Sequence, residues 1–187
     1  LKARLCVQGR RRLYAFLDKH HVTYDRCGKL VVATKADEIP RLEEILQQAR
    51  DNDVEGMAEL TKAQALAMEP ELNVAAALHS PQSGIFESHS YFVALQGEIE
   101  ASGGAVVLST PFESATPLDD GGFSVHAGGE EPTTLTCRYL VTAPGLSAQA
   151  VAATIEGFPK ASIPKGHYGK GMYFRLSGKA PFSRLIY

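Results

Sequence analysis

The sequence predicts a mixed α+β fold in which an antiparallel-rich sheet is combined with a separate β-meander. Up to residue 104, amphipathic helical segments alternate with short runs of β-branched and aromatic residues. After residue 104 the chain reads mostly as short strands separated by glycine turns, followed by a helix of small residues. With 187 residues, of which 44% are apolar and 21% charged, the chain is long enough to bury a substantial core.

Helices are predicted where apolar residues recur at helical spacing between start and stop signals. Thr61 can cap the helix that follows it while Gln64 reaches back to Thr61, which is the capping-box pattern. Ser88 is the predicted N-cap of a later helix, which Gly103 and Gly104 end in the left-handed conformation that glycine permits. The predicted helices cover residues 1–21, 35–53, 62–68, 88–102 and 146–155.

Strands are predicted from short apolar or alternating runs that are bounded by turn residues. Cys27 and Gly28 predict the turn of a hairpin over residues 22–34. Asp119-Asp120-Gly121-Gly122 and Gly128-Gly129 predict the turns of the meander. The other predicted strands cover residues 55–60, 73–80, 105–110, 112–118, 122–127, 133–144, 163–176 and 180–187, and the last two are expected to pair as a hairpin.

Charge and cysteine content exclude several classes of protein. The formal net charge is only −2 and both signs are interspersed, which argues against a nucleic-acid partner. Cys6, Cys27 and Cys137 are odd in number and widely spaced, so we expect reduced thiols in a cytoplasmic protein, with no disulfide framework and no metal site. No run approaches the roughly 18 consecutive apolar residues of a membrane-spanning helix.

Two long stretches carry a family resemblance. The text "SGIFESHSYFVALQGEIEASGGAVVLSTPF", followed after the meander by "RYLVTAPGLSAQAVA", resembles the D-amino-acid-oxidase-like FAD-dependent oxidoreductases. The opening "LKARLCVQGRRRLYAFLDKHHVTYDRCGKLVVAT" and the closing "KGMYFRLSGKAPFSRLIY" resemble the L-2-hydroxyglutarate dehydrogenase and oxidase branch. The resemblance implies that residues 1–21 and 84–158 belong to an FAD-binding domain, and residues 22–83 and 159–187 to a substrate-binding domain.

The ends of the chain lead us to expect an internal piece of a longer enzyme. The sequence opens within a predicted helix without an N-cap or an initiator Met, and "APFSRLIY" ends it within a predicted strand. A Gly-x-Gly-x-x-Gly fingerprint, which would cradle the pyrophosphate of FAD, does not occur, because Gly166-x-x-Gly169-x-Gly171 has a different spacing.

The cofactor-binding residues are predicted at the turn between the last meander strand and the helix. Ala143 and Gly145 are small, and amide groups at the start of a helix suit a phosphate or a closely approaching cofactor. Any tight strand-to-helix turn also favours small residues, so the pattern alone leaves both explanations open. The resemblance implies that this turn, with Leu146, contacts FAD and that Phe112 lies against its adenine part.

The resemblance implies a small carboxylate substrate whose carboxylate is bound by a cation. Arg184 between Phe182 and Leu185 is a candidate clamp, although an Arg on the outer face of a strand explains the pattern equally well. The other histidines are interpreted as structural, while His89 is either catalytic or a surface residue. The predicted catalytic residues are His89, Tyr168, Tyr173 and Arg184, and the predicted substrate-binding residues are Lys170, Arg184 and Tyr187; Lys170 stands where the hydroxyglutarate branch would have Arg.

Two classes of function stay open from the sequence. The first is an FAD-dependent oxidoreductase that oxidises a 2-hydroxy acid such as L-2-hydroxyglutarate, with an amino-acid, sarcosine or glycerol phosphate oxidase as its nearest variant. The second is a non-catalytic piece that does not hold FAD alone. The electron acceptor is open among oxygen, a quinone and a carrier protein, and a quinone would bring the protein to the periphery of the inner membrane.

Overall fold

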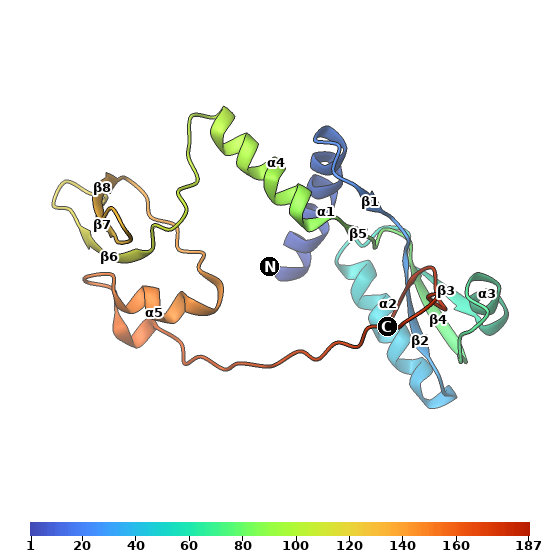
Figure 1. Cartoon of the computed structure of the whole chain (residues 1–187). Coiled ribbons are helices and arrows are strands. Elements are labelled where there is room, and N and C mark those ends of the chain that lie inside the picture. The colour runs from blue at the N-terminus through green and yellow to red at the C-terminus, as the bar shows by residue number, and fades with distance from the viewer. The chain divides into compact units, whose positions relative to one another are not determined.

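The computed structural model describes all 187 residues, which form two compact units (Figure 1). The first unit contains Leu1–Gly104 and Arg175–Tyr187, and the second contains Ala105–Phe174. None of the helices combines the length and the apolar character that crossing a bilayer requires.

The first unit is built on a four-stranded sheet with the order β3-β4-β2-β9. β2 (Lys29–Ala33) pairs antiparallel with β4 (Ala76–Ser80), which pairs antiparallel with β3 (Ala58–Thr61). β9 (Leu185–Ile186) lies on the other side of β2 and runs parallel to it. The predicted antiparallel-rich sheet is therefore confirmed.

Helices cover the two faces of this sheet because side chains alternate along each strand (Figure 1). α2 (Ile39–Asp51) covers one face and α3 (Lys62–Met68) the other. The cluster under α2 contains Val31, Ala33, Leu42, Leu46 and Leu78, and the cluster under α3 contains Leu30, Ala65, Leu72, Val74 and Ala77, with Phe182 and Ile186 packed against it.

A third cluster joins α1 (Lys2–Lys19) to α4 (Ser88–Ala101) within the first unit. The buried residues are Tyr14, Leu17 and Val22, with Tyr91 and Ala94 of α4 packed against them. Close by, β1 (Tyr24–Asp25) pairs antiparallel with β5 (Ile85–Phe86). Short 3₁₀ turns lie at Ala36–Glu38, Gly145–Ser147 and Lys160–Ser162 of the chain.

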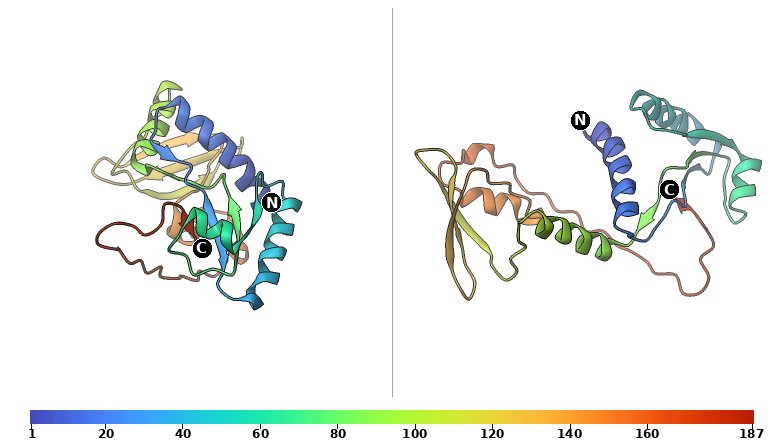
Figure 2. Two further views of the ribbon diagram at one scale, coloured as in Figure 1. Left: turned by 90° about the vertical axis from the view of Figure 1, so that its right-hand side faces the viewer. Right: turned by 90° about the horizontal axis from the view of Figure 1, so that it is seen from above.

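The second unit contains the predicted meander, in which β6 (Phe112–Pro117), β7 (Phe123–Ala127) and β8 (Thr133–Cys137) pair in sequence order. Figure 2 shows α5 (Ala148–Ala153) beside it, and a bridge joins Ala115 of β6 to Ile155 just after α5. The meander is thus confirmed.

Two local predictions in the first unit are corrected. The hairpin over residues 22–34 is not formed, because β1 pairs with β5 whereas β2 pairs with β4 and β9. Gly28, with φ +76°, turns the chain from one sheet into the other. The N-cap of α4 is Glu87 and not Ser88, since the Glu87 carboxylate accepts hydrogen bonds from the amides of His89 and Ser90.

Four predicted strands are wrong or too long. Residues 105–110 and 163–176 form no strand, β8 ends at Cys137 where a strand to residue 144 was predicted, and β9 covers only Leu185–Ile186 of the strand predicted over 180–187. The closing hairpin is also wrong, because β9 pairs with β2. A strand needs a neighbouring ladder, and these segments have none in the structure.

The predicted division into a cofactor part and a substrate part stays a prediction. Strands from residues 22–83 and 180–187 do form one sheet, and α1 does pack against α4. The compact units, however, are divided at Gly104 and Phe174, so their boundaries differ from those of the predicted domains.

Candidate functional site

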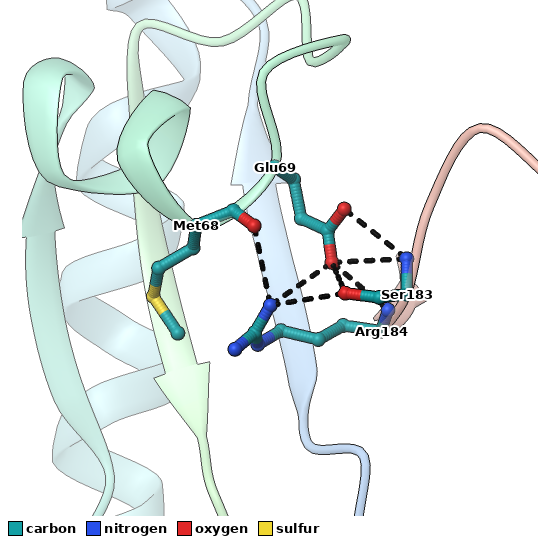
Figure 3. A network of polar contacts seen from close by, with 4 residues as sticks. All are labelled: Met68, Glu69, Ser183 and Arg184. Atoms are coloured by element: carbon teal, nitrogen blue, oxygen red, sulfur yellow. Dashed lines mark hydrogen bonds and ion pairs between the residues drawn. The ribbon is translucent and has the colours of Figure 1, made fainter.

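A buried carboxylate organises the end of the sheet where β9 joins it (Figure 3). Glu69, directly after α3, is only 3% exposed. It accepts hydrogen bonds from the amide (3.1 Å) and hydroxyl (2.6 Å) of Ser183, and from the amide (2.9 Å) and Nη1 (3.1 Å) of Arg184. Burial alone would raise the pKa of Glu69, but the donors from Ser183 and Arg184 outweigh burial and lower it. The carboxylate is therefore ionised and fully satisfied.

Arg184 uses only one of its guanidinium nitrogens in this network. Its Nη1 donates to Glu69, to the carbonyl oxygen of Met68 (3.2 Å) and to the hydroxyl of Ser183 (3.1 Å). Nε and Nη2 have no hydrogen-bond partner in the chain, and in Figure 3 the rest of the guanidinium points away from Glu69. The side chain is 28% exposed, so this free edge is reachable from solvent. The edge has the fork geometry that binds a carboxylate.

His79 of β4 lies on the same face of the sheet. His79 is paired with Leu30 of β2, and Leu30 is paired with Ile186 of β9, so these three side chains share one face. Arg184 is two residues before Ile186 and therefore lies toward the same face. Burial, and then the charge of Arg184, lower the pKa of His79, so its imidazole is neutral at neutral pH. A Cβ on Gly28 would lie 3.1 Å from His79 Nε2, which shows that the ring lies over this glycine.

The remaining candidates of the first unit lie apart from this network. The backbone of Tyr187 bonds to Leu30 and Val32, while its side chain is 82% exposed with Lys29 Nζ 5.8 Å from the ring centroid. His89 is exposed in the first turn of α4, and no hydrogen bond or ion pair joins its side chain to Arg184. Their roles stay predictions.

The cofactor candidates lie in the second unit and fit only the apolar parts of FAD. Phe112 is half-buried on β6, whereas Ala143, Gly145 and Leu146 are exposed. Gly145 has φ +58° and open space around its missing side chain, so a flat ring could approach the backbone. α5, which follows this turn, has six residues, and the cofactor-binding roles of these residues stay predictions.

Tyr168, Lys170 and Tyr173 are exposed and lie outside any helix or strand, which differs from the predicted strand position. The Tyr168 hydroxyl is 3.5 Å from the carbonyl oxygen of Leu146, and Tyr173 is 96% exposed. No hydrogen bond joins these three side chains to one another. The catalytic roles of Tyr168 and Tyr173 and the substrate-binding role of Lys170 stay predictions.

Sequence reasoning missed Glu69 and His79. Glu69 stands in "MEPEL" next to a second acid, Glu71, and nothing local distinguishes the buried one. His79 could have been noticed, because it is a titratable residue in the otherwise apolar strand "AAALHS".

Several solved structures share the fold of this chain. L-proline dehydrogenase from P. horikoshii matches with a TM-score of 0.70 at 14% identity, over 81% of this chain and 40% of that one. Glycine oxidase from Geobacillus kaustophilus matches with a TM-score of 0.67 at 24% identity, over 80% of this chain and 41% of that one. The chain thus has the fold of these dehydrogenases and oxidases.

The family follows from the sequence match. The family described as FAD dependent oxidoreductase matches residues 1–185, and the chain belongs to it. Mitochondrial L-2-hydroxyglutarate dehydrogenase of Arabidopsis thaliana is 34% identical, covering 100% of this chain and 45% of the relative. The corresponding enzyme of Caenorhabditis elegans is 33% identical, covering 82% of this chain and 36% of the relative. The predicted resemblance is confirmed, FAD is the cofactor of the family, and the chain spans less than half the length of these relatives.

Proposed function

We propose that the intact protein uses FAD to oxidise a small 2-hydroxy acid, L-2-hydroxyglutarate or a close analogue. The observation that carries the proposal is the similarity of the whole chain to an L-2-hydroxyglutarate dehydrogenase at 34% identity. FAD, when bound, supplies the chemistry of hydride acceptance. The residues of this chain supply binding and orientation.

Within this proposal Arg184 binds the substrate carboxylate through Nε and Nη2. Its free edge and partial exposure support that role. Lys170 and Tyr187 are the further candidates for substrate binding, and His89, Tyr168 and Tyr173 for catalysis. Phe112, Ala143, Gly145 and Leu146 would lie along the apolar parts of the cofactor.

The test is anaerobic reduction of the intact, flavin-loaded protein. L-2-hydroxyglutarate should bleach the visible flavin absorbance, and the D-enantiomer should not. A flavoprotein that stays oxidised with L-2-hydroxyglutarate would contradict the proposal. In the folded protein with normal flavin content, we expect Arg184→Lys to lower kcat/KM at least about tenfold, since a point charge does not replace a bidentate fork.

A second candidate is an amino-acid oxidase, because the glycine oxidase fold matches with a TM-score of 0.67. Bleaching by glycine or sarcosine, and not by the hydroxy acid, would favour it. Glycerol 3-phosphate belongs in the same assay, since L-alpha-glycerophosphate oxidase from Mycoplasma pneumoniae matches with a TM-score of 0.62.

We also propose a cytoplasmic location, which three free cysteines support. A quinone acceptor would add peripheral association with the inner membrane. Cell fractionation tests the location, and turnover with oxygen, a soluble quinone or an electron-carrier protein distinguishes the acceptors.

A further inference from the structure

We propose that Glu69 and His79 complete a carboxylate-binding site with Arg184, in which Glu69 is a positioning residue and His79 supplies a second donor to the bound carboxylate. The inference deepens the proposed function and rests on it for the identity of the ligand, a small 2-hydroxy or 2-oxo acid. The roles of Glu69 and His79 are inferred from their contacts and not from the similarity to known proteins.

The first step is the orientation of the guanidinium. Nη1 of Arg184 is held by acceptors on two segments, the Glu69 carboxylate and Met68 carbonyl at 3.1 and 3.2 Å, and the Ser183 hydroxyl at 3.1 Å. These contacts leave the Nε–Nη2 edge free. A guanidinium fixed in this way loses less conformational entropy when it binds a ligand than a free Arg side chain does.

The second step is the charge that a ligand would meet. Glu69 does not rely on Arg184 alone, because the amide and hydroxyl of Ser183 and the amide of Arg184 also donate to it. These additional donors share the charge of the Glu69 carboxylate, so it is not neutralised by the Arg184 guanidinium alone. A carboxylate at the free edge would therefore be attracted.

The third step is the geometry at Gly28, which lies near His79 and bonds to the residue after Arg184. Its carbonyl accepts the amide of Leu185 at 3.1 Å, next to Arg184, and its missing side chain leaves room for the His79 ring. The imidazole has no hydrogen-bond partner in the chain and is only partly buried. His79 is thus free to donate to a ligand bound at Arg184.

The experiment measures binding of 2-oxoglutarate to the intact, oxidised flavoprotein by titration calorimetry. His79→Gln and Glu69→Gln should each weaken binding at least about tenfold, with flavin content unchanged. His126→Gln is the matched control, since His126 is exposed on the meander and bonds only to Thr134, and it should bind as the wild type does. In turnover, His79→Gln and Glu69→Gln should raise KM for L-2-hydroxyglutarate and leave kcat within about twofold, which a general loss of structure would not do.

Wild-type affinity in folded His79→Gln or Glu69→Gln would overturn the assigned role of that residue. If Glu69→Gln does not fold, Ser183→Ala decides: it removes one hydroxyl from Nη1 and from Glu69, and unchanged affinity would exclude positioning. If the wild type binds 2-oxoglutarate but does not oxidise L-2-hydroxyglutarate, and the variants lose this binding, the proposed function is refuted and the site is supported. If the wild type oxidises L-2-hydroxyglutarate and all variants bind 2-oxoglutarate as it does, the function is supported and the site is refuted. A wild type that does not bind 2-oxoglutarate also overturns the site.

Discussion

Replacing Arg184 by alanine should destabilise the first unit, because the buried Glu69 would lose its charged partner. Truncating one member of a buried ion pair costs about 3–5 kcal/mol. Here Glu69 is 3% exposed but keeps the donors of Ser183 and the main-chain amide of residue 184, and the Arg184 side chain is 28% exposed. We therefore expect a loss smaller than that range, about 2 kcal/mol.

Urea unfolding of the intact protein measures this effect. Arg41→Ala is the matched control, since Arg41 and its partner Glu44 are 65% and 61% exposed, and it should change the unfolding free energy by less than about 0.5 kcal/mol. Replacing Glu69 by leucine as well should not restore stability, because the amides of Ser183 and residue 184 and the Ser183 hydroxyl then lose their acceptor. An Arg184→Ala midpoint equal to that of Arg41→Ala would refute the reasoning.

Three further changes test other features of the first unit. Folding lowers the pKa of Glu69, so the stabilisation by its carboxylate should be full above the unfolded pKa of about 4.3 and lost as the pH falls through the folded pKa. Between about pH 7 and 3, the urea concentration at the unfolding midpoint should therefore fall less for Glu69→Gln than for the wild type. An equal fall in both proteins would contradict this. Thr61→Ala removes the acceptor of the Gln64 amide and should lower stability by about 1 kcal/mol in urea titrations, whereas an unchanged midpoint would contradict the capping role. Gly28→Ala should cost about 1–2 kcal/mol because φ is +76°, and crowding of His79 should also weaken 2-oxoglutarate binding; normal stability and binding would contradict both effects.

Features with local signals could be predicted from the sequence. The apolar spacing of residues 35–53 predicts α2, observed at Ile39–Asp51, and the Thr61–Gln64 capping box is observed as predicted. The meander turns at 119–122 and 128–129 also carry their own glycines. Each of these features depends on residues a few positions apart, so the sequence contains its cause.

Features with distant partners could not be predicted. β9 pairs with β2, and Ser183 bonds to Glu69 across 114 residues of sequence. The apolar run at 105–110 looks like a strand by composition, but a strand forms only where a ladder of hydrogen bonds is available. For the site, the apolar neighbours of Arg184 led us to predict a role for it, whereas its partner Glu69 has no distinguishing neighbour in the sequence.

The candidate site and the sheet depend on each other through β9. This strand has only two residues. Two backbone bonds hold it and the next residue against β2 and the residue before β2: Leu185 N to Gly28 O at 3.1 Å and Tyr187 N to Leu30 O at 2.9 Å. So short a pairing contributes little by itself, because each hydrogen bond adds only about 1 kcal/mol net. Packing of the residues on either side of Arg184 against the α3 cluster, and the bonds to Glu69, must therefore hold β9 in place. Since the same bonds fix the guanidinium, any change that releases β9 from the sheet also removes Arg184 from the site.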